Sequence, residues 1–433
     1  MSDPRAAFID ATLWHGSLDE AAAILTAHPE IAASDIHTAA ILGDDAAVRR
    51  FLQLDPGNAT AKDGPRQCDA LTYLCFSKYL RLQPERSDAF LRAATALLDA
   101  GASANTGFFE MAHQPKPEFE SVLYGAAGVA QHAGLTRLLL ERGADPNDAE
   151  TPYHSPESFD NGAVRVLLES GKLADDSRAT MLLRKADMHD YDGMKLVLEH
   201  GADPNRRTHW GLTAMHQAMR RDNGIAMITL LLDRGADPTI ENREGRSAVT
   251  IAARRGRADA LALFEERGFS VTLPGADGLI AACARNDAAA IHAAAPETVR
   301  EVVAEGGTLL AEFAANGNTE AVARLLDLGV SIAAVSEQGD MYYGVAKNST
   351  ALHAAAWRAQ HETVKYLIGR GAPVNALDGK GRSALALAVK ACVDSYWTFK
   401  RSPDSVQALL DTGASKDGVA FPSGYAEVDA LLT

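Results

Sequence analysis

The sequence predicts an all-α protein made of stacked helix-turn-helix units, and a repeated spacing is the main reason. Between residues 196 and 255 an apolar helical run ends twice in Gly-Ala-Asp-Pro, once at Gly201 and again 34 residues later at Gly235. Each copy is followed by a polar loop and then by a second apolar run. A fixed period of about 20 to 50 residues is typical of proteins whose units stack on one another.

The residues that end these runs suit such a repeat. A glycine after a helix readily takes the left-handed conformation that ends it. The Asp-Pro that follows favours an extended, turn-forming chain. Small side chains let neighbouring inner helices approach closely, and each unit needs its neighbours because it cannot bury its apolar face alone. The small residues are Ala252, Ala253, Ala354, Ala355, Ala386 and Ala388.

The repeated pattern resembles the ankyrin repeat, whose inner helix opens Thr-Pro-Leu-His-x-Ala-Ala and whose outer helix closes Leu-Leu-x-x-Gly-Ala-Asp-Pro-Asn. Alanine replaces the proline in both inner-helix copies, and the proline survives only at Pro152. The resemblance implies an ankyrin-repeat solenoid with hairpin-like loops, whose usual function is protein–protein recognition. It also implies that His216 and His353 bond to the backbone of turns. The matching segments are residues 212–218, 349–355 and 143–147, with weaker copies at 101–105, 371–375 and 413–416.

We expect one continuous solenoid of about twelve units over residues 1–433, because no low-complexity linker divides the chain. Spacings of 42 residues, from Gly329 to Gly371 and from Gly371 to Gly413, indicate insertions in the last repeats. Residues 108–117 are too rich in proline for a helix, so we expect a loop there. The expected segments are divergent units at 1–60, central repeats at 61–272, degenerate repeats at 273–334, two repeats with insertions at 335–417 and a C-terminal cap at 418–433.

The composition argues against several classes of function. A net charge of −15 without a basic run suits neither nucleic acid nor an anionic membrane surface. No apolar stretch is long enough to span a membrane, and the N-terminus lacks the features of a signal peptide. Motifs for metals, dinucleotides and phosphate loops are missing, so we expect no cofactor and no metal. The four cysteines lie far apart, which together with the high alanine content fits a monomeric, cytoplasmic, bacterial protein.

One candidate site lies in the last two repeats, where aromatic residues accompany a carboxylate. If the inner helix continues past Ala391, then Asp394, Trp397 and Arg401 share one helix face. A carboxylate among aromatic rings has a raised pKa, which suits general acid or base chemistry. The other rings expected at this pocket are Tyr342, Tyr343 and Trp357.

A structural interpretation of this segment stays open. Trp397 and Tyr396 would then fill the space that the insertion opens. Asp394 would pair with Lys390 or Arg401, which leaves no carboxylate for chemistry.

A second candidate site is the pair His189-Asp190, with His209-Trp210 one repeat later. In the ankyrin frame both pairs lie at loop positions, on the side that faces a ligand. A histidine beside an aspartate can act as a base that the carboxylate orients. The alternative is a polar turn before the outer helix at residues 193–199.

Two functions of different classes remain open. The first is an ankyrin-repeat scaffold that binds a protein partner through its concave face, where an acidic groove prefers a basic partner. The alternative is a cofactor-independent enzyme with acid–base or cation-stabilising chemistry on a small organic substrate, in an aromatic pocket around Asp394, with His189 and Asp190 as further catalytic candidates. A third possibility is a stability or immunity partner of a neighbouring gene product. The binding residues of the scaffold hypothesis are hot-spot types, namely Trp210, Tyr342, Tyr343, Trp357, Tyr396, Trp397 and Arg401.

Overall fold

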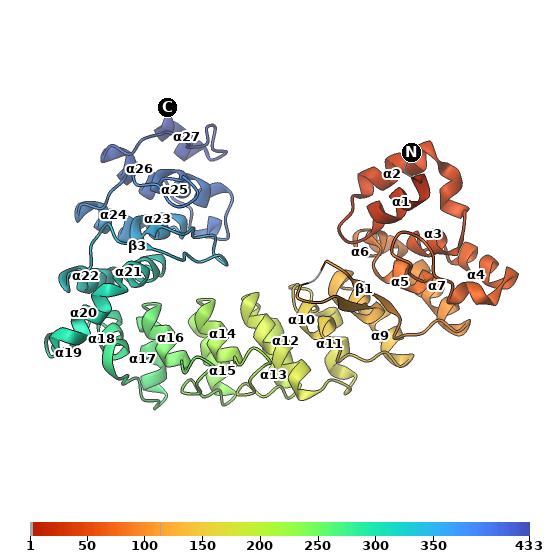
Figure 1. Cartoon of the computed structure of the whole chain (residues 1–433), viewed down its shortest axis with the longest axis horizontal. Coiled ribbons are helices and arrows are strands. Elements are labelled where there is room, and N and C mark those ends of the chain that lie inside the picture. Colours follow the sequence, from red (N-terminus) through yellow and green to blue (C-terminus); the bar gives the residue numbers. More distant parts are fainter. Residues whose placement is uncertain (1–2, 113) are drawn as a thin grey trace. The chain divides into compact units, whose positions relative to one another are not determined.

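A computed structural model describes residues 3–112 and 114–433, and its regular structure is mostly helical (Figure 1). The chain forms two compact units. Unit 1 comprises Met1–Ala218 and Leu230–Ala236, and unit 2 comprises Met219–Thr229 and Asp237–Thr433. The helical class and the repeated helix pairs that the sequence predicts are confirmed. The single continuous solenoid and its internal boundaries stay predictions.

Helix pairs with short turns follow one another along unit 1. The first two pairs turn around Gly16 and Gly43. Short 3₁₀ turns lie at Pro29–Ala33, Pro56–Ala59 and Pro84–Arg86, and a π-helical turn lies at Gly125–Val129. The elements are α1 (Pro4–Thr12), α2 (Leu18–Ala27), α3 (Ile36–Ile41), α4 (Asp45–Leu54), α5 (Ala70–Cys75), α6 (Lys78–Leu82), α7 (Ser87–Asp99), β1 (Gly107–Glu110), β2 (Glu118–Ser121), α8 (Val122–Tyr124), α9 (Ala133–Glu141), α10 (Glu150–His154), α11 (Gly162–Glu169), α12 (Asp175–Asp187), α13 (Tyr191–Glu199) and α14 (Ala214–Arg220), whose end belongs to unit 2.

Unit 2 continues the helix pairs and ends in a short helix, which confirms the helix expected near the C-terminus. A 3₁₀ turn lies at Thr398–Lys400. The elements are α15 (Ile225–Asp233), whose end belongs to unit 1, α16 (Ala248–Arg254), α17 (Ala258–Glu266), α18 (Gly275–Ala284), α19 (Ala288–His292), α20 (Pro296–Ala304), α21 (Gly306–Ala315), α22 (Thr319–Asp327), β3 (Val335–Ser336), β4 (Ser349–Thr350), α23 (Ala351–Trp357), α24 (His361–Gly369), α25 (Ala384–Val393), α26 (Asp404–Asp411) and α27 (Ala426–Leu432).

The glycines that end the outer helices have left-handed backbones, as the repeat pattern predicts. Gly201 has a φ of 82° and Gly235 a φ of 84°, a region that side chains with a Cβ disfavour. The asparagine at the end of the motif then links neighbouring repeats. The side-chain amide of Asn205 donates to the carbonyl oxygen of Gly235 at 2.8 Å, and that of Asn105 donates to the carbonyl oxygen of Gly143 at 3.0 Å. The motif thus sets both the end of a helix and its spacing from the next repeat.

The motif histidine of unit 2 binds turns, as the resemblance implies. The backbone N–H of Thr350 donates to Nδ1 of His353 at 3.2 Å, so Nε2 carries the proton. Nε2 donates to the carbonyl oxygen of Ala376, 3.0 Å away in the turn of the next repeat. In unit 1 the backbone N–H of Thr213 donates to Nδ1 of His216 at 3.1 Å. These histidines hold the stack together.

The loop predicted at residues 108–117 is wrong for Phe108–Glu110, which lie in strand β1, whereas residues 111–112 and 114–117 connect this strand to β2 in an antiparallel hairpin. β1 pairs with β2 so that Phe109 faces Phe119 across the strands, with ring centroids 5.2 Å apart. Aromatic residues favour strands, and a cross-strand ring pair stabilises a hairpin. The prolines occupy only the connection between the strands. The tertiary pairing of residues on either side of this connection therefore decides the structure.

Small and apolar side chains form the cores of both units. The inner helices bury their alanines completely or nearly so, for example Ala354 and Ala355 of α23, which allows α21 and α25 to pack on either side. Within residues 3–112 and 114–433, no helix is both long enough and apolar enough to cross a bilayer.

Candidate functional site

The predicted aromatic residues of the last repeats gather around a buried arginine of unit 2. Trp397 and Tyr343 are almost completely buried, and so is Arg358. The guanidinium carbon of Arg358 lies 4.4 Å from the ring centroid of Tyr343 and 4.5 Å from that of Trp397. Cation–π contacts of this kind stabilise a guanidinium held away from water. The rings therefore form a cage that the protein's own Arg358 fills.

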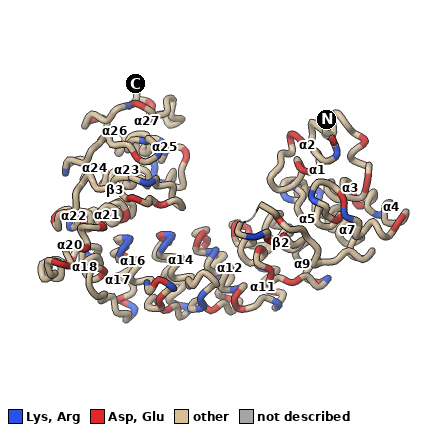
Figure 2. The backbone as a smooth tube through the Cα atoms, viewed as in Figure 1, with Lys and Arg blue, Asp and Glu red and all other residues tan. Residues whose placement is uncertain are grey.

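A buried carboxylate balances the charge of this arginine. Asp222 accepts from Arg358 at 2.8 Å and from Arg255 at 2.7 and 2.6 Å. Burial opposes its ionisation, but Arg255 and Arg358 outweigh burial and hold the pKa of Asp222 far below its usual value. Basic residues at the end of α16 are visible in blue in Figure 2. The arginines and Asp222 form a fixed ion network with a structural role.

The insertion loop before β4 is fastened to this network. The hydroxyl of Tyr343 donates to the carbonyl oxygen of Arg221, and the indole N–H of Trp357 donates to the carbonyl oxygen of Tyr343. The guanidinium carbon of Arg221 lies 3.5 Å from the ring centroid of Tyr342. Four of the predicted binding residues thus lie together, and the hydroxyl of Tyr343 and the indole N–H of Trp357 bond to the chain itself.

Asp394 does not lie among these rings, so the pocket expected around it is wrong in its geometry. The inner helix α25 ends at Val393, and Asp394 caps its end instead of sharing a face with Trp397. The Asp394 side chain is 81% exposed, and its carboxylate lies 3.4 Å from the ammonium of Lys390. The structural interpretation of this ion pair matches the observed contact. Of the remaining predicted residues, Arg401 lies over the ring of Tyr425 at 4.9 Å, and Tyr396 is exposed.

The predicted pair His189-Asp190 forms a turn with a structural role for the aspartate. Asp190 is buried and caps α13 by accepting from the backbone N–H of Gly193 at 2.8 Å. It also accepts at 2.8 Å from the ammonium of Lys185, which is completely buried. Burial opposes the ionisation of Asp190, but Lys185 and the other donors hold its pKa below the usual value. Asp190 is committed to these bonds, which matches the polar-turn alternative.

His209-Trp210, the other half of the second predicted site, lines the pocket that we select as the candidate site. This unit 1 pocket is a cavity of about 1220 Å³. It brings together residues from the end of α1, the β1–β2 hairpin, α8, α10 and the loop before α14. The lining includes Trp14, Glu120, Tyr124, Glu150, His154 and Trp210.

Aromatic rings form a continuous row along this pocket. Trp14 and Tyr124 have ring centroids 5.5 Å apart, and Tyr124 and His154 are 5.1 Å apart. Tyr153 then lies 4.7 Å from His154 and 5.5 Å from Trp210. These spacings are those of tilted and edge-on ring pairs, which hold one another in place. The row offers ring faces and edges to a ligand over the length of the cavity.

The hairpin supplies carboxylates to the same pocket. Glu118 and Glu120 are two residues apart on β2, so they share one face of the hairpin. Glu110 lies opposite Glu118 in the register, and it also lines the pocket. Like charges directly opposite one another weaken a strand pair. A placement that costs stability and faces a cavity is typical of a binding site.

Two groups in the pocket have pKa values well above their usual ones. Burial raises the pKa of Glu120 to about 8, and the neighbouring carboxylate of Glu150 adds to the shift. Burial opposes protonation of His154, but its ring nitrogens lie 3.0 Å from Glu150 and 3.0 Å from Glu157, which raise its pKa to about 9. At neutral pH, Glu120 is therefore mostly neutral and His154 is charged. Shifted groups in a cavity indicate a functional site.

The sequence contains weak signals for this pocket. Carboxylates alternate with an aromatic residue at Glu118-Phe119-Glu120, which is a strand pattern. Glu150 and His154 are four residues apart, which places them on one face of a helix. Trp14 and Tyr124 carry no such signal, because only the fold brings them together.

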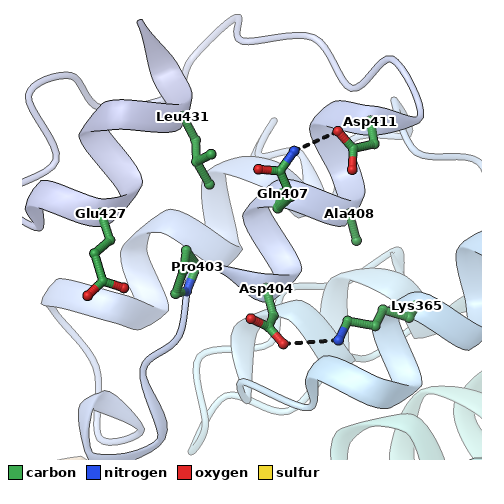
Figure 3. A pocket seen from close by; sticks show the side chains of 8 residues that line it. All are labelled: Lys365, Pro403, Asp404, Gln407, Ala408, Asp411, Glu427 and Leu431. Atoms are coloured by element: carbon green, nitrogen blue, oxygen red, sulfur yellow. Dashed lines mark hydrogen bonds and ion pairs between the residues drawn. The ribbon is translucent and has the colours of Figure 1, made fainter.

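A second cavity, of about 590 Å³, lies between α24, α26 and α27 of unit 2 (Figure 3). Lys365 bonds with Asp404 across it at 3.0 Å, and Gln407 donates to Asp411 at 2.6 Å. These polar side chains already bond with one another. In the described part of the chain, no group of three or more His, Cys, Asp and Glu side chains is arranged to hold a metal ion.

Comparison with known proteins identifies the family. A family model of ankyrin repeats, which spans three copies, matches residues 182–275, 274–378 and 310–418. Among 354 matching chains of solved structures is the ankyrin repeat domain of human ASB11, with 20% sequence identity and a TM-score of 0.28, covering 61% of this chain and 98% of that chain. No curated protein matches. Because the matched segments of the family model span more than half of the sequence, the chain belongs to the ankyrin-repeat family.

Proposed function

We propose that this protein is a recognition scaffold that binds a basic segment of a partner protein in the unit 1 pocket. Ankyrin repeats usually bind protein partners. The observation that carries the proposal is the cavity of about 1220 Å³, which is lined by aromatic rings and glutamates, together with Arg66 and Arg81. Tryptophan and tyrosine concentrate binding energy at interfaces. The net charge of −15 also favours encounter with a positively charged partner.

The buried aromatic residues predicted as binding residues in unit 2 are less suited to recognition than Trp210 of the unit 1 pocket. Tyr343 and Trp397 pack around Arg358 and Trp357 packs against the same cluster, while the hydroxyl of Tyr343 and the indole N–H of Trp357 bond within the unit. An interface hot spot requires rings that a partner can cover. Trp210 meets this requirement, because it lines the unit 1 pocket and remains 38% exposed.

Selection from a random library of twelve-residue peptides on the immobilised full chain tests this proposal. We expect the enriched peptides to be rich in Arg and Lys, and to lose at least five-fold in affinity for Trp210→Ala. The matched control is Tyr191→Ala, because Tyr191 is an exposed ring of unit 1 that does not line the pocket. If no peptide is enriched, or if the enriched peptides bind Trp210→Ala as tightly as the native chain, the proposed function is wrong.

Acid–base catalysis on a small organic molecule is the second candidate function, and the same pocket favours it. Glu120 and His154 have pKa values of about 8 and about 9, which are close to those useful in proton transfer at neutral pH. Under this hypothesis the catalytic acid or base is Glu120 and not Asp394, whose carboxylate is exposed to solvent. A panel of small carbonyl compounds and amines tests it. Turnover that Glu120→Gln retains in full would contradict this assignment.

A further inference from the structure

We infer that the unit 1 pocket takes up a guanidinium side chain of the partner, stacked on its aromatic row and paired with the carboxylate of Glu120. This inference rests on the proposed function and specifies the chemistry of the group that enters the pocket. Neither the family nor the pattern of the sequence assigns a ligand to these residues.

The chain's own Arg184 shows the same chemistry at the edge of the pocket. Its guanidinium carbon lies 4.1 Å from the ring centroid of Tyr153, which belongs to the aromatic row. The same guanidinium donates to Glu157, which also lines the cavity. A planar guanidinium can stack on a ring while its edge bonds with a carboxylate, whereas an ammonium cannot do both in this way.

Two further arginines repeat this arrangement. Arg66, which lines the same pocket, lies 5.4 Å from the ring centroid of Phe108 and donates to Glu110 at 2.9 Å. In unit 2, Arg358 lies between two rings and donates to Asp222. Rings and carboxylates therefore surround the guanidinium groups of Arg184, Arg66 and Arg358 alike. The centre of the unit 1 pocket contains the same kinds of side chain around a cavity.

Glu120 is an almost completely buried carboxylate of the pocket lining, with an exposed fraction of 1%. It lies on the pocket face of β2, which packs against α10. The charged groups that act on it are Glu150, His154, Glu110 and Asp148, and three of these four are carboxylates. The surroundings therefore disfavour the ionised carboxylate at this position, and an incoming guanidinium lessens that cost.

Cation binding is consequently coupled to proton release. In the free protein Glu120 is mostly protonated at neutral pH, because its pKa is about 8. A guanidinium nearby favours the carboxylate, so the proton leaves to solvent as the cation enters. Binding should strengthen as the pH rises from about 6.5 to about 8.5. A cation bound only by the aromatic rings would not release this proton.

Titration of the full chain with N-acetylarginine amide tests the inference, with the uncharged isostere N-acetylcitrulline amide as the matched probe. Tryptophan fluorescence reports on all four tryptophans of the chain, of which Trp14 and Trp210 line the pocket, and calorimetry in buffers of different ionisation enthalpy counts protons. We expect the arginine probe to bind about ten-fold more tightly than the citrulline probe. At pH 7.5 we expect release of roughly 0.75 proton per probe, because a carboxyl group of pKa about 8 is about three-quarters protonated there.

The variant Glu120→Gln removes the ionisable carboxylate and so measures its contribution to binding. Glutamine resembles the neutral form that the free protein holds at pH 7, so we expect this variant to fold with an unchanged melting temperature. It should bind the arginine probe about ten-fold more weakly and lose most of the proton release. The control Glu141→Gln removes an exposed carboxylate of the same unit and should change neither quantity.

Three results would overturn the inference without touching the proposed function. The citrulline probe binds as tightly as the arginine probe, or Glu120→Gln keeps the full affinity and proton release, or N-acetyllysine amide binds as tightly as the arginine probe. In each case, peptides selected on the pocket would still demonstrate recognition by the scaffold. If instead no peptide is selected, or if the selected peptides bind Trp210→Ala as tightly as the native chain, the proposed function itself is wrong.

Discussion

At the scale of single residues, two side chains of the unit 1 pocket hold protons more tightly in the folded protein than in the unfolded chain. The pKa of Glu120 rises from its usual 4.5 to about 8, and that of His154 rises from 6.5 to about 9. In both cases the folded state binds the extra proton. Neutral carboxyl and charged imidazole are therefore the resting states of this pocket.

The stability of the protein should accordingly fall as the pH rises. The favourable contribution of Glu120 protonation is lost between about pH 4.5 and 8, and that of His154 between about pH 6.5 and 9. We expect the urea midpoint to decrease between pH 6.5 and 8.5. Glu120→Gln cannot ionise at this position, so its midpoint should decrease less and should exceed that of the native chain at pH 8.5. Parallel curves for the two proteins would contradict the assigned pKa of Glu120.

Two glycines at the end of α24 differ in backbone conformation, so that substitution by alanine should have opposite effects on stability at the two positions. Gly371 has a φ of 84°, whereas Gly369 is the last helical residue, and a Cβ at either position would meet no atom within 4 Å. Gly371→Ala should lower the free energy of unfolding by about 1 kcal/mol, because alanine disfavours the left-handed region. Gly369→Ala should raise it by about 0.5 kcal/mol. Urea unfolding measures both, and equal shifts would mean that backbone conformation is not the cause.

At the scale of elements, the β1–β2 hairpin differs most from the plain repeat. Its aromatic pair, Phe109 and Phe119, holds the strands together, while its other face carries glutamates into the pocket. The sequence correctly excludes a helix for residues 108–117, but it does not reveal the strand pairing. The same limit applies to α25, whose end at Val393 depends on how Trp397 packs against Tyr343.

A change from negative to positive charge on the hairpin should therefore raise the stability of the protein and weaken its binding of basic peptides. Glu118→Lys replaces a like-charge pair opposite Glu110 with an opposite-charge pair. We expect the free energy of unfolding to rise by about 0.5 kcal/mol. The affinity for basic peptides should fall at least ten-fold, because a positive charge then enters the pocket. Glu85→Lys, an exposed change of equal charge in the same unit, should leave the affinity nearly unchanged. A loss of affinity with Glu85→Lys would show that only the net charge matters.

At the scale of the whole molecule, contacts between residues far apart in sequence decide which predicted sites exist. Within unit 2, Asp222 and Arg358 are 136 residues apart and still form a direct ion pair. Arg255 completes the network from α16. Because these charges are buried together, removal of one of them leaves another without compensation.

Asp222→Asn should accordingly lower the free energy of unfolding by about 3 kcal/mol, because Arg358 stays buried without its counter-ion. The double variant Asp222→Asn with Arg358→Met should recover part of this loss. Asp394→Asn is the control, because the exposed pair of Asp394 with Lys390 contributes little. Chemical unfolding at pH 7 provides the comparison. A double variant as unstable as the sum of the two single variants would contradict the coupling.

The sequence by itself determined the repeat of this protein: the period, the left-handed glycines at Gly201 and Gly235, and the turn-binding His353. These features are local, since each depends on residues within one unit or its neighbour. Only the tertiary structure decided that Arg358 fills the predicted aromatic cage, and that Trp14 and Trp210 line one pocket. The physical reason is that burial, and with it charge pairing and pKa, depends on side chains brought together by stacking, which no local pattern encodes.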